Sequence, residues 1–407
     1  MPWKECTAMS ERRELVELVR QGMVSISSMS ERFGVSRKTI YKWMERYERL
    51  GVEGLGDQSR RPHGSSVKTS ESMEAMVLAL RKENPAWGGR KLRRVLLDRG
   101  VTGVPSMSTI TEILRRHGVL HQPGERVVRP YQRFEHEQPN DLWQMDFKGH
   151  VGMGNGKRCH PLTVLDDHSR YSLVLQACGN EQGETVQSAL IVAFRKYGLP
   201  KRMLTDNGPP WGVTQEEASW SRLVVWLYRL GVQVSHGRPG HPQTQGKEER
   251  FHRTLKLEVL GVERADLEAY QSQFDPWREK YNHERPHEGI GLKVPASRYR
   301  VSDRAYPEVL PEWEYPRGDV VRAVQDGGRL QFGGVVWSVS KAFVGERLAI
   351  RPSGMDGVWS LWFAGELLGE LDEREVRQRS RRMGRVVTPV GLRPPSVTTL
   401  PIPPECT

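Results

Sequence analysis

The chain contains little cysteine and no long apolar run. Its 4 cysteines lie far apart in 407 residues and form no CxxC pair, which argues against a disulfide framework and against a structural zinc site. No apolar run exceeds six residues, as in LVVWLY at 223–228, which is far too short to span a bilayer. The N-terminus also lacks the apolar stretch of a secretory signal. We therefore expect a cytoplasmic protein with no membrane partner.

What the chain does have is length and positive charge. With 407 residues it is too long for one ordinary core, so several domains are expected. Residues 1–135 hold 25 lysines and arginines against 16 acidic residues, so this third carries +9 of the net charge of +11. A basic block ahead of a nearly neutral one indicates a nucleic-acid-binding portion. Composition alone leaves open a soluble protein with a basic surface.

Residues 1–55 have the pattern of a helix-turn-helix domain. Ser36 can cap a helix from Arg37 to about Leu50, on which Ile40 and Trp43 begin an apolar stripe. The opposite face could lie in a major groove of double-stranded DNA. Its candidate DNA-binding residues are Arg37, Lys38, Tyr41, Lys42 and Arg46. The alternative is a helical hairpin with a solvated face.

A second helical DNA-binding domain is predicted at 71–120, after a linker at 56–70. Apolar residues at helical spacing mark three helices, and basic residues line their outside. Its candidate DNA-binding residues are Arg90, Lys91, Arg115 and Arg116. A polar, proline-punctuated linker follows at 121–139.

From residue 140 the pattern becomes that of an α/β domain. Three strand-like runs in succession, then alternating helices and strands, predict a mixed sheet covered by helices over 140–300. Short strands and Gly-rich turns at 317–372 suit a small β-barrel. A basic, Pro-rich tail occupies 373–407. The fold class is thus multidomain, with all-α units, an α/β core and a small β domain.

Three acidic residues stand out in this predicted core. Asp146 lies in an apolar strand-like run, Asp206 follows another such run, and Glu249 opens a helix. Each has an ordinary explanation: an exposed strand end, an Asp-Asn-Gly turn, and a favourable helix N-terminus. Together they occupy strand ends and a helix start on one sheet, and converging carboxylates bind hard divalent cations. Asp166 and Asp167 also end a strand, and we interpret them as a turn that could support the site.

The order WQMDF, TDNG, HPQTQGKEERFHRTLK and YNHERPHEGIGLKVP resembles the integrase-type core of bacterial insertion-sequence transposases. That family belongs to the DDE superfamily, which has a ribonuclease-H-like fold and includes retroviral integrases. The resemblance covers roughly 140–300 and implies that Asp146, Asp206 and Glu249 are the catalytic, metal-binding acids. Two features depart from the family pattern. The 42 residues between Asp206 and Glu249 exceed its usual spacing, and Glu248 adjoins Glu249.

The resemblance also implies a mechanism and partners. Two Mg²⁺ ions, for which Mn²⁺ would substitute, would support phosphodiester cleavage and joining without a protein nucleophile. The partners would be the element's terminal repeats and target DNA, with the chain acting as a homo-oligomer on DNA. His252, Arg253 and Lys256 would contact the DNA backbone. Two alternatives stay open: a non-catalytic DNA-binding regulator descended from a transposase, and a ribonuclease-H-like nuclease that only hydrolyses.

Overall fold

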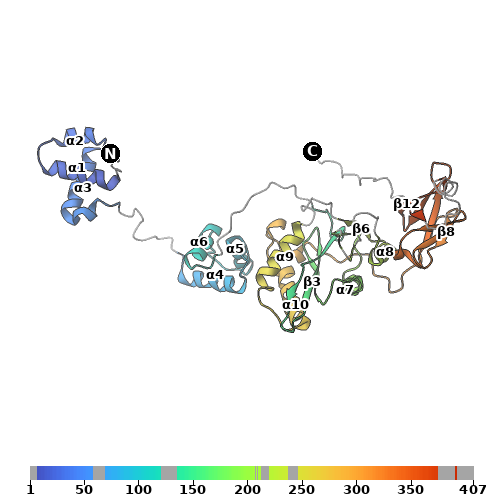
Figure 1. The fold of residues 1–407 in the computed structure, drawn as a ribbon. Helices are drawn as coiled ribbons and strands as arrows, with labels where there is room; N and C mark the ends of the chain where they lie inside the picture. Colours follow the sequence, from blue (N-terminus) through green and yellow to red (C-terminus); the bar gives the residue numbers. More distant parts are fainter. Residues whose placement is uncertain are drawn as a thin grey trace. The chain divides into compact units, whose positions relative to one another are not determined.

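The computed structural model describes residues 7–57, 69–120, 135–206, 208, 210–211, 220–236 and 246–374, and the backbone of 390–391. The chain divides into two compact units, Met1–Thr69 and Ser70–Thr407 (Figure 1). Most of both predicted linkers, most of the loop insertion after Asp206 and nearly all of the basic tail lie outside the described residues. Among the described helices, none has both the length and the apolar character needed to cross a membrane.

The first unit is a small bundle of three helices. They are α1 (Ala8–Arg20), α2 (Ile26–Arg32) and α3 (Arg37–Leu50), followed by the 3₁₀ turn η1 (Gly51–Leu55). Ser36 caps α3, because its hydroxyl accepts a hydrogen bond from the Thr39 amide at 3.2 Å. Ile40 and Trp43 are buried against α1 and α2. The predicted cap and apolar stripe are confirmed.

A second helical bundle opens the other unit. It contains α4 (Glu71–Glu83), α5 (Gly89–Asp98) and α6 (Met107–Arg116). Val77, Leu92 and Ile110, one from each helix, are fully buried. A Cβ atom added at Gly89 would lie 2.5 Å from the Met107 carbonyl oxygen. Only glycine therefore allows α5 and α6 to approach this closely.

The core is built on a mixed sheet, as predicted. Its strands are β1 (Leu142–Phe147), β2 (Val151–Gly152), β3 (Arg158–Asp166), β4 (Ser172–Cys178), β5 (Arg202–Thr205) and β6 (Gln233–His236). The order along the main part of the sheet is β4-β3-β1-β5-β6, and the short β2 pairs with β3. The first three of these strands run antiparallel, whereas β5 is parallel to β1 and β6 is parallel to β5.

Helices cover both faces of this sheet. They are α7 (Gly183–Tyr197), α8 (Arg222–Arg229), α9 (Gly246–Glu258) and α10 (Leu267–His283). Trp143 and Met145 of β1 pack with α7 and α8, whereas Leu165 of β3 packs with α9 and α10. Because side chains alternate along a strand, Gln144 and Asp146 point toward the α9 side.

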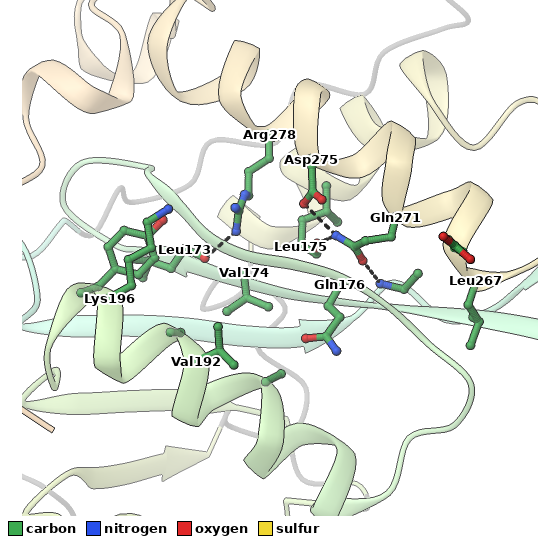
Figure 2. A pocket seen from close by; sticks show the side chains of 15 residues that line it. Leu173, Val174, Leu175, Gln176, Val192, Lys196, Leu267, Gln271, Asp275 and Arg278 are labelled. Atoms are coloured by element: carbon green, nitrogen blue, oxygen red, sulfur yellow. Dashed lines mark hydrogen bonds between the residues drawn. The ribbon is translucent and has the colours of Figure 1, made fainter. Parts of the chain in front are cut away.

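The outer edge of β4 is covered by side chains of α10 (Figure 2). Gln271 donates to the Leu175 carbonyl at 3.1 Å and accepts from the Ala177 amide at 2.8 Å. Arg278 donates to the Leu173 carbonyl at 3.0 Å. These bonds take the place of a neighbouring strand, so this edge of the sheet is not free for strand addition.

The C-terminal part consists of two small sheets. Their strands are β7 (Val320–Ala323), β8 (Arg329–Phe332), β9 (Val335–Ser338), β10 (Arg347–Pro352), β11 (Val358–Phe363), β12 (Glu366–Asp372) and β13 (Val390–Gly391). One sheet has the order β12-β11-β10-β7 and the other β13-β9-β8. The predicted β structure is confirmed, while closure into a barrel stays a prediction.

Helix α8 belongs to two apolar cores at once. Trp226 and Leu227 pack in the core beneath the large sheet. Val225 packs instead among residues of the C-terminal sheets, including Phe343 and Phe363. This double burial accounts for the unbroken apolar run at 223–228.

Candidate active site

Asp146 and Asp206 are brought together by two neighbouring parallel strands. Leu142 of β1 lies opposite Arg202 of β5, and Gln144 lies opposite Leu204. Continuing this register by two residues places Asp146 level with Asp206. Burial, followed by the charge of Asp206, raises the pKa of Asp146 to about 7. Two of the three predicted acids therefore share one site and repel each other there.

Asp206 combines the two roles that its motif suggested. It follows the last residue of β5, Thr205. The Gly208 amide donates to its carboxylate at 3.2 Å, which is the contact of an Asx turn. The turn interpretation and the site interpretation of this aspartate are thus compatible.

The two neighbouring glutamates of α9 have opposite environments. Glu248 is 1% exposed, and its carboxylate lies 3.1 Å from the Thr163 hydroxyl. Burial, followed by the charge of Asp146, raises the pKa of Glu248 well above its usual range. Glu249 is exposed. Adjacent helix positions point about 100° apart, so the two carboxyl groups cannot occupy the same place.

His252 lies beneath Asp146 and not on the outer surface. It is 7% exposed. Its Nε2 lies 2.8 Å from the Thr163 hydroxyl, and its Nδ1 lies 3.9 Å from the Asp146 carboxylate. Burial, followed by the charge of Lys148, lowers the pKa of His252 to about 3. The burial of His252 favours a supporting contact beneath Asp146, and its contact with the DNA backbone stays a prediction.

The outer face of α9 is charged. Glu249, Arg253 and Lys256 are exposed, whereas Phe251 and Leu255 are buried. This is the separation of two faces that helical spacing produces. A DNA contact by Arg253 and Lys256 stays a prediction.

Both aspartates of the turn between β3 and β4 bond to other residues of the chain. Asp166 accepts hydrogen bonds from the amides of Asn140 at 2.7 Å and Ser169 at 2.8 Å. Asp167 forms an ion pair with Lys247, the second residue of α9. The interpretation of these aspartates as a supporting turn agrees with these contacts. Lys247 was not singled out in the sequence, because only the fold brings it to the turn.

The candidate DNA-binding residues of α3 lie mostly in the open. Arg37, Lys38, Tyr41 and Lys42 are exposed. Arg46 is half-buried, with its guanidinium 5.2 Å from the centre of the Trp43 ring. Their accessibility suits a contact with DNA, which stays a prediction.

The candidate residues of the second bundle already have partners within the chain. Arg115 pairs with Glu112, and Arg116 lies 2.6 Å from Glu74. Arg90 lies 4.0 Å from Glu288 of the core. Lys91 is half-buried, and burial, followed by the charge of Arg285, lowers its pKa to about 8. Of these four candidates, the half-buried Lys91 suits a phosphate contact least.

No group of three or more histidine, cysteine, aspartate or glutamate side chains within the described ranges is arranged to hold a metal ion. The structural observations that bear on metal binding are therefore the register of β1 and β5 and the position of α9.

Family models match most of the chain in separate segments. Two models of the integrase core domain match residues 136–242 and 230–295. A model of the C-terminal domain of IS481 family transposases matches residues 319–379. A helix-turn-helix model matches residues 11–63, and a homeodomain-like model matches residues 39–114.

Individual relatives include proteins of two bacterial insertion elements. The chain is 27% identical over 243 residues to the insertion element IS407 uncharacterized 31.7 kDa protein of Burkholderia multivorans, covering 58% of this chain and 83% of that protein. It is 29% identical over 167 residues to the insertion element IS476 uncharacterized 39.2 kDa protein of Xanthomonas euvesicatoria, covering 41% of this chain and 46% of that protein.

One similar solved structure is a chain of the simian T-cell lymphotropic virus intasome in complex with PP2A regulatory subunit B56 gamma. It is 18% identical, with a TM-score of 0.34, and the match covers 72% of this chain and 97% of that chain. The family models and the insertion-element proteins carry the assignment. The chain is thus related to insertion-sequence transposases, with a retroviral-integrase-like core behind N-terminal helix-turn-helix domains.

Proposed function

We propose that the chain is a DNA transposase that binds the ends of its mobile element, cleaves there to free 3′ hydroxyls and joins them to target DNA. The observation that carries this proposal is the parallel register of β1 and β5, which sets Asp146 level with Asp206. Helix α9, which bears Glu249, packs on the same face of the sheet. In this proposal Glu249 completes, with Asp146 and Asp206, a set of three acids from distant parts of the chain.

The third acid of the site is Glu249, as the family motif implies. Mg²⁺ keeps several of its waters when bound to protein carboxylates, so its ligands need access to solvent. Glu249 is exposed, whereas Glu248 is 1% exposed. Glu249 also precedes His252 by one helical turn, and His252 approaches Asp146. Glu248 lies behind the site and supports it through Thr163.

The donor set of these residues fits a divalent cation. Carboxylate oxygens are the hard ligands that Mg²⁺ and Mn²⁺ prefer. Burial and the charge of Asp206 raise the pKa of Asp146 despite the nearby charge of Lys148, so a bound cation would stabilise its ionised form. Asp146, Asp206 and Glu249 would hold two Mg²⁺ ions. Bound there, the ions would lower the pKa of water and stabilise charge on the attacking and leaving oxygens.

The chain's own residues orient the reaction. Thr163 donates to the Asp146 carbonyl at 2.9 Å and also lies within hydrogen-bond distance of His252, so it fixes the strand beneath the site. Arg253 and Lys256 on α9 hold the DNA backbone without reading sequence. Water attacks first and leaves a 3′ hydroxyl, which then attacks a phosphodiester of the target. No covalent enzyme–DNA intermediate forms.

DNA recognition falls to the helical bundles. The exposed basic residues of α3 lie in the major groove of the terminal repeat, and those of α6 contact its backbone. An element has two ends that must react with one target, so the chain acts on DNA as a homo-oligomer. This assignment follows from the helix-turn-helix matches and from the exposure of the basic faces.

Strand joining on oligonucleotides that carry the element's ends tests the proposal. Asp146→Asn is expected to bind ends normally and to join none of them in Mg²⁺ or Mn²⁺, because a metal-binding carboxylate is lost. Asp303→Asn, at an exposed acid of the same part of the chain, serves as a control and should join like the wild type. Joined product from Asp146→Asn would contradict the assignment.

A matched pair of variants tests which glutamate acts. Glu249→Gln should abolish joining. Glu248→Gln should retain most of it, because burial favours the neutral form of Glu248 and glutamine has the same shape. The reverse result would assign the third acid to Glu248. Nicked but unjoined products from the wild type would favour a nuclease, and binding without either product would favour a regulator.

A further inference from the structure

We propose that Asp167 and Lys247 form a positioning pair that sets the distance between the strand carrying Asp146 and the helix turn carrying Glu249. The inference rests on the proposed function, because it concerns the same three acids. It assigns a role to two residues that touch neither DNA nor metal in that mechanism.

The carboxylate of Asp167 is a junction between elements. One oxygen accepts from the Gln144 amide group at 2.7 Å and from the Lys247 ammonium group. The other oxygen accepts from the His136 backbone amide at 2.9 Å. Asp167 is 3% exposed. With both oxygens engaged and little solvent access, Asp167 is a supporting group and not a ligand.

Gln144 and Lys247, which both bond to Asp167, each precede one of the acids by two residues in the sequence. Gln144 precedes Asp146 by two residues in β1 and so points to the same face of the sheet. Lys247 precedes Glu249 by two residues in the first turn of α9. Within the described part of the chain, the Asp167 bond is the one side-chain hydrogen bond of Gln144. A single carboxylate therefore ties the strand of one acid to the helix of another.

Electrostatics explains why such a tie is needed. Asp146, Asp206 and Glu249 carry like charges, so without a cation they favour separation of α9 from the sheet. The Lys247 side chain is 18% exposed, and Asp167 holds its ammonium group on the side of the α9 turn opposite Glu249. A second contact, from the ammonium group to the Asp167 backbone carbonyl at 3.3 Å, restrains it further. The pair thus keeps the metal-binding groups in place before the metal arrives.

Metal binding by the full-length chain tests the inference. We compare wild type, Asp167→Asn, Lys247→Met and the double variant, measuring free Mn²⁺ by electron paramagnetic resonance without DNA. Loss of such a supporting partner typically weakens metal affinity 10–100-fold, so each single variant should raise the Mn²⁺ dissociation constant about tenfold. The double variant should resemble the single ones, because both changes break the same link.

Three controls separate positioning from general damage. Asp141→Asn breaks the 2.8 Å ion pair with Lys201 just before β1, leaves the ion pair of Asp167 with Lys247 intact, and should leave Mn²⁺ affinity unchanged. Lys247→Arg keeps the charge and should retain near-wild-type affinity. Joining by the Asp167→Asn and Lys247→Met variants should recover at high Mg²⁺, while their binding of DNA ends stays normal. An unfolded variant would show loss of end binding that metal does not restore.

The outcomes distinguish this inference from the proposed function. Unchanged Mn²⁺ affinity in Asp167→Asn and Lys247→Met, or an equal loss in Asp141→Asn, overturns the positioning pair. Absence of Mn²⁺ binding by the wild type overturns it as well. A wild type that binds Mn²⁺ but joins no DNA refutes the proposed function, and the positioning pair is then judged on the Mn²⁺ affinities alone.

Discussion

At the scale of single residues, the proposed site depends on which of two adjacent glutamates is exposed to solvent and which is buried. Glu248 and Glu249 are the same residue type at adjacent positions, yet Glu248 is 1% exposed and Glu249 is exposed. Motif and helix spacing selected Glu249 for the outer face, and its exposure agrees. They could not show that Glu248 would be buried against Thr163, because that contact joins residues 85 positions apart.

The same limit applies to His252. On a helix wheel this residue adjoins the basic face, and its contact with DNA stays a prediction. Its burial depends on how closely α9 lies on β1 and β3, and a single sequence does not contain that distance. Asp146 and Asp206 were easier to predict, because parallel strands with acids at their ends bring those acids to one edge.

The raised pKa of Asp146 gives a pH dependence without metal. Folding raises this pKa from 3.8 to about 7, so the folded chain holds the proton more tightly than the unfolded chain does. The contribution of Asp146 to the free energy of unfolding is therefore most favourable below about pH 4, and it declines as the pH rises to about 7. Chemical denaturation in a chelator should show a smaller decline over this range in Asp146→Asn than in the wild type. Equal slopes would contradict the shift.

At the scale of elements, local signals placed the helices and strands well. The sequence predicted a helix from Arg37 to about Leu50, and α3 spans Arg37–Leu50. The Ser36 cap and the apolar stripe of α3 were likewise readable, because both depend on neighbours within two turns. The small sheets near the C-terminus were expected as a barrel, but closure depends on pairing between distant strands.

Helix α3 offers a prediction at this scale. Lys42 is exposed, and its ammonium group lies 4.5 Å from the centre of the Trp43 ring. If α3 enters a groove with Lys42 on a phosphate, Lys42→Ala should weaken end binding. The slope of log affinity against log salt should also fall by about 1. Gel-shift titrations at several salt concentrations measure both. Lys157→Ala, at an exposed lysine of the β2–β3 turn, should change neither, and an unchanged slope in Lys42→Ala would remove α3 from the interface.

At the scale of the whole molecule, α8 couples the large sheet to the C-terminal sheets. Trp220, just before α8, contacts Phe343 with ring centres 5.1 Å apart, and Arg229 pairs with Glu346 at 3.3 Å. In the sequence, the apolar run at 223–228 indicated only that it is too short to span a bilayer. Its second buried face became evident only when both cores were in view.

Replacing Phe343, which is 1% exposed, tests this coupling. Phe343→Ala should lower the free energy of unfolding by about 3–5 kcal/mol, the usual cost of emptying such a site. Hydrogen exchange should rise in α8 as well as in the C-terminal sheets. Phe332→Ala, at a half-buried ring against Trp359, should act within the C-terminal sheets alone. Unchanged exchange in α8 of Phe343→Ala would show that the two cores are independent.

The shared helix has a consequence for how this gene can lose function. A premature stop codon ahead of Val320 would leave the three acids and both helical bundles encoded, yet it would strip the cover from Val225 and Tyr228. The shortened product would expose this apolar and aromatic surface to solvent and would aggregate. Decay from the 3′ end of the gene should therefore yield insoluble protein and not a smaller enzyme that still cuts and joins.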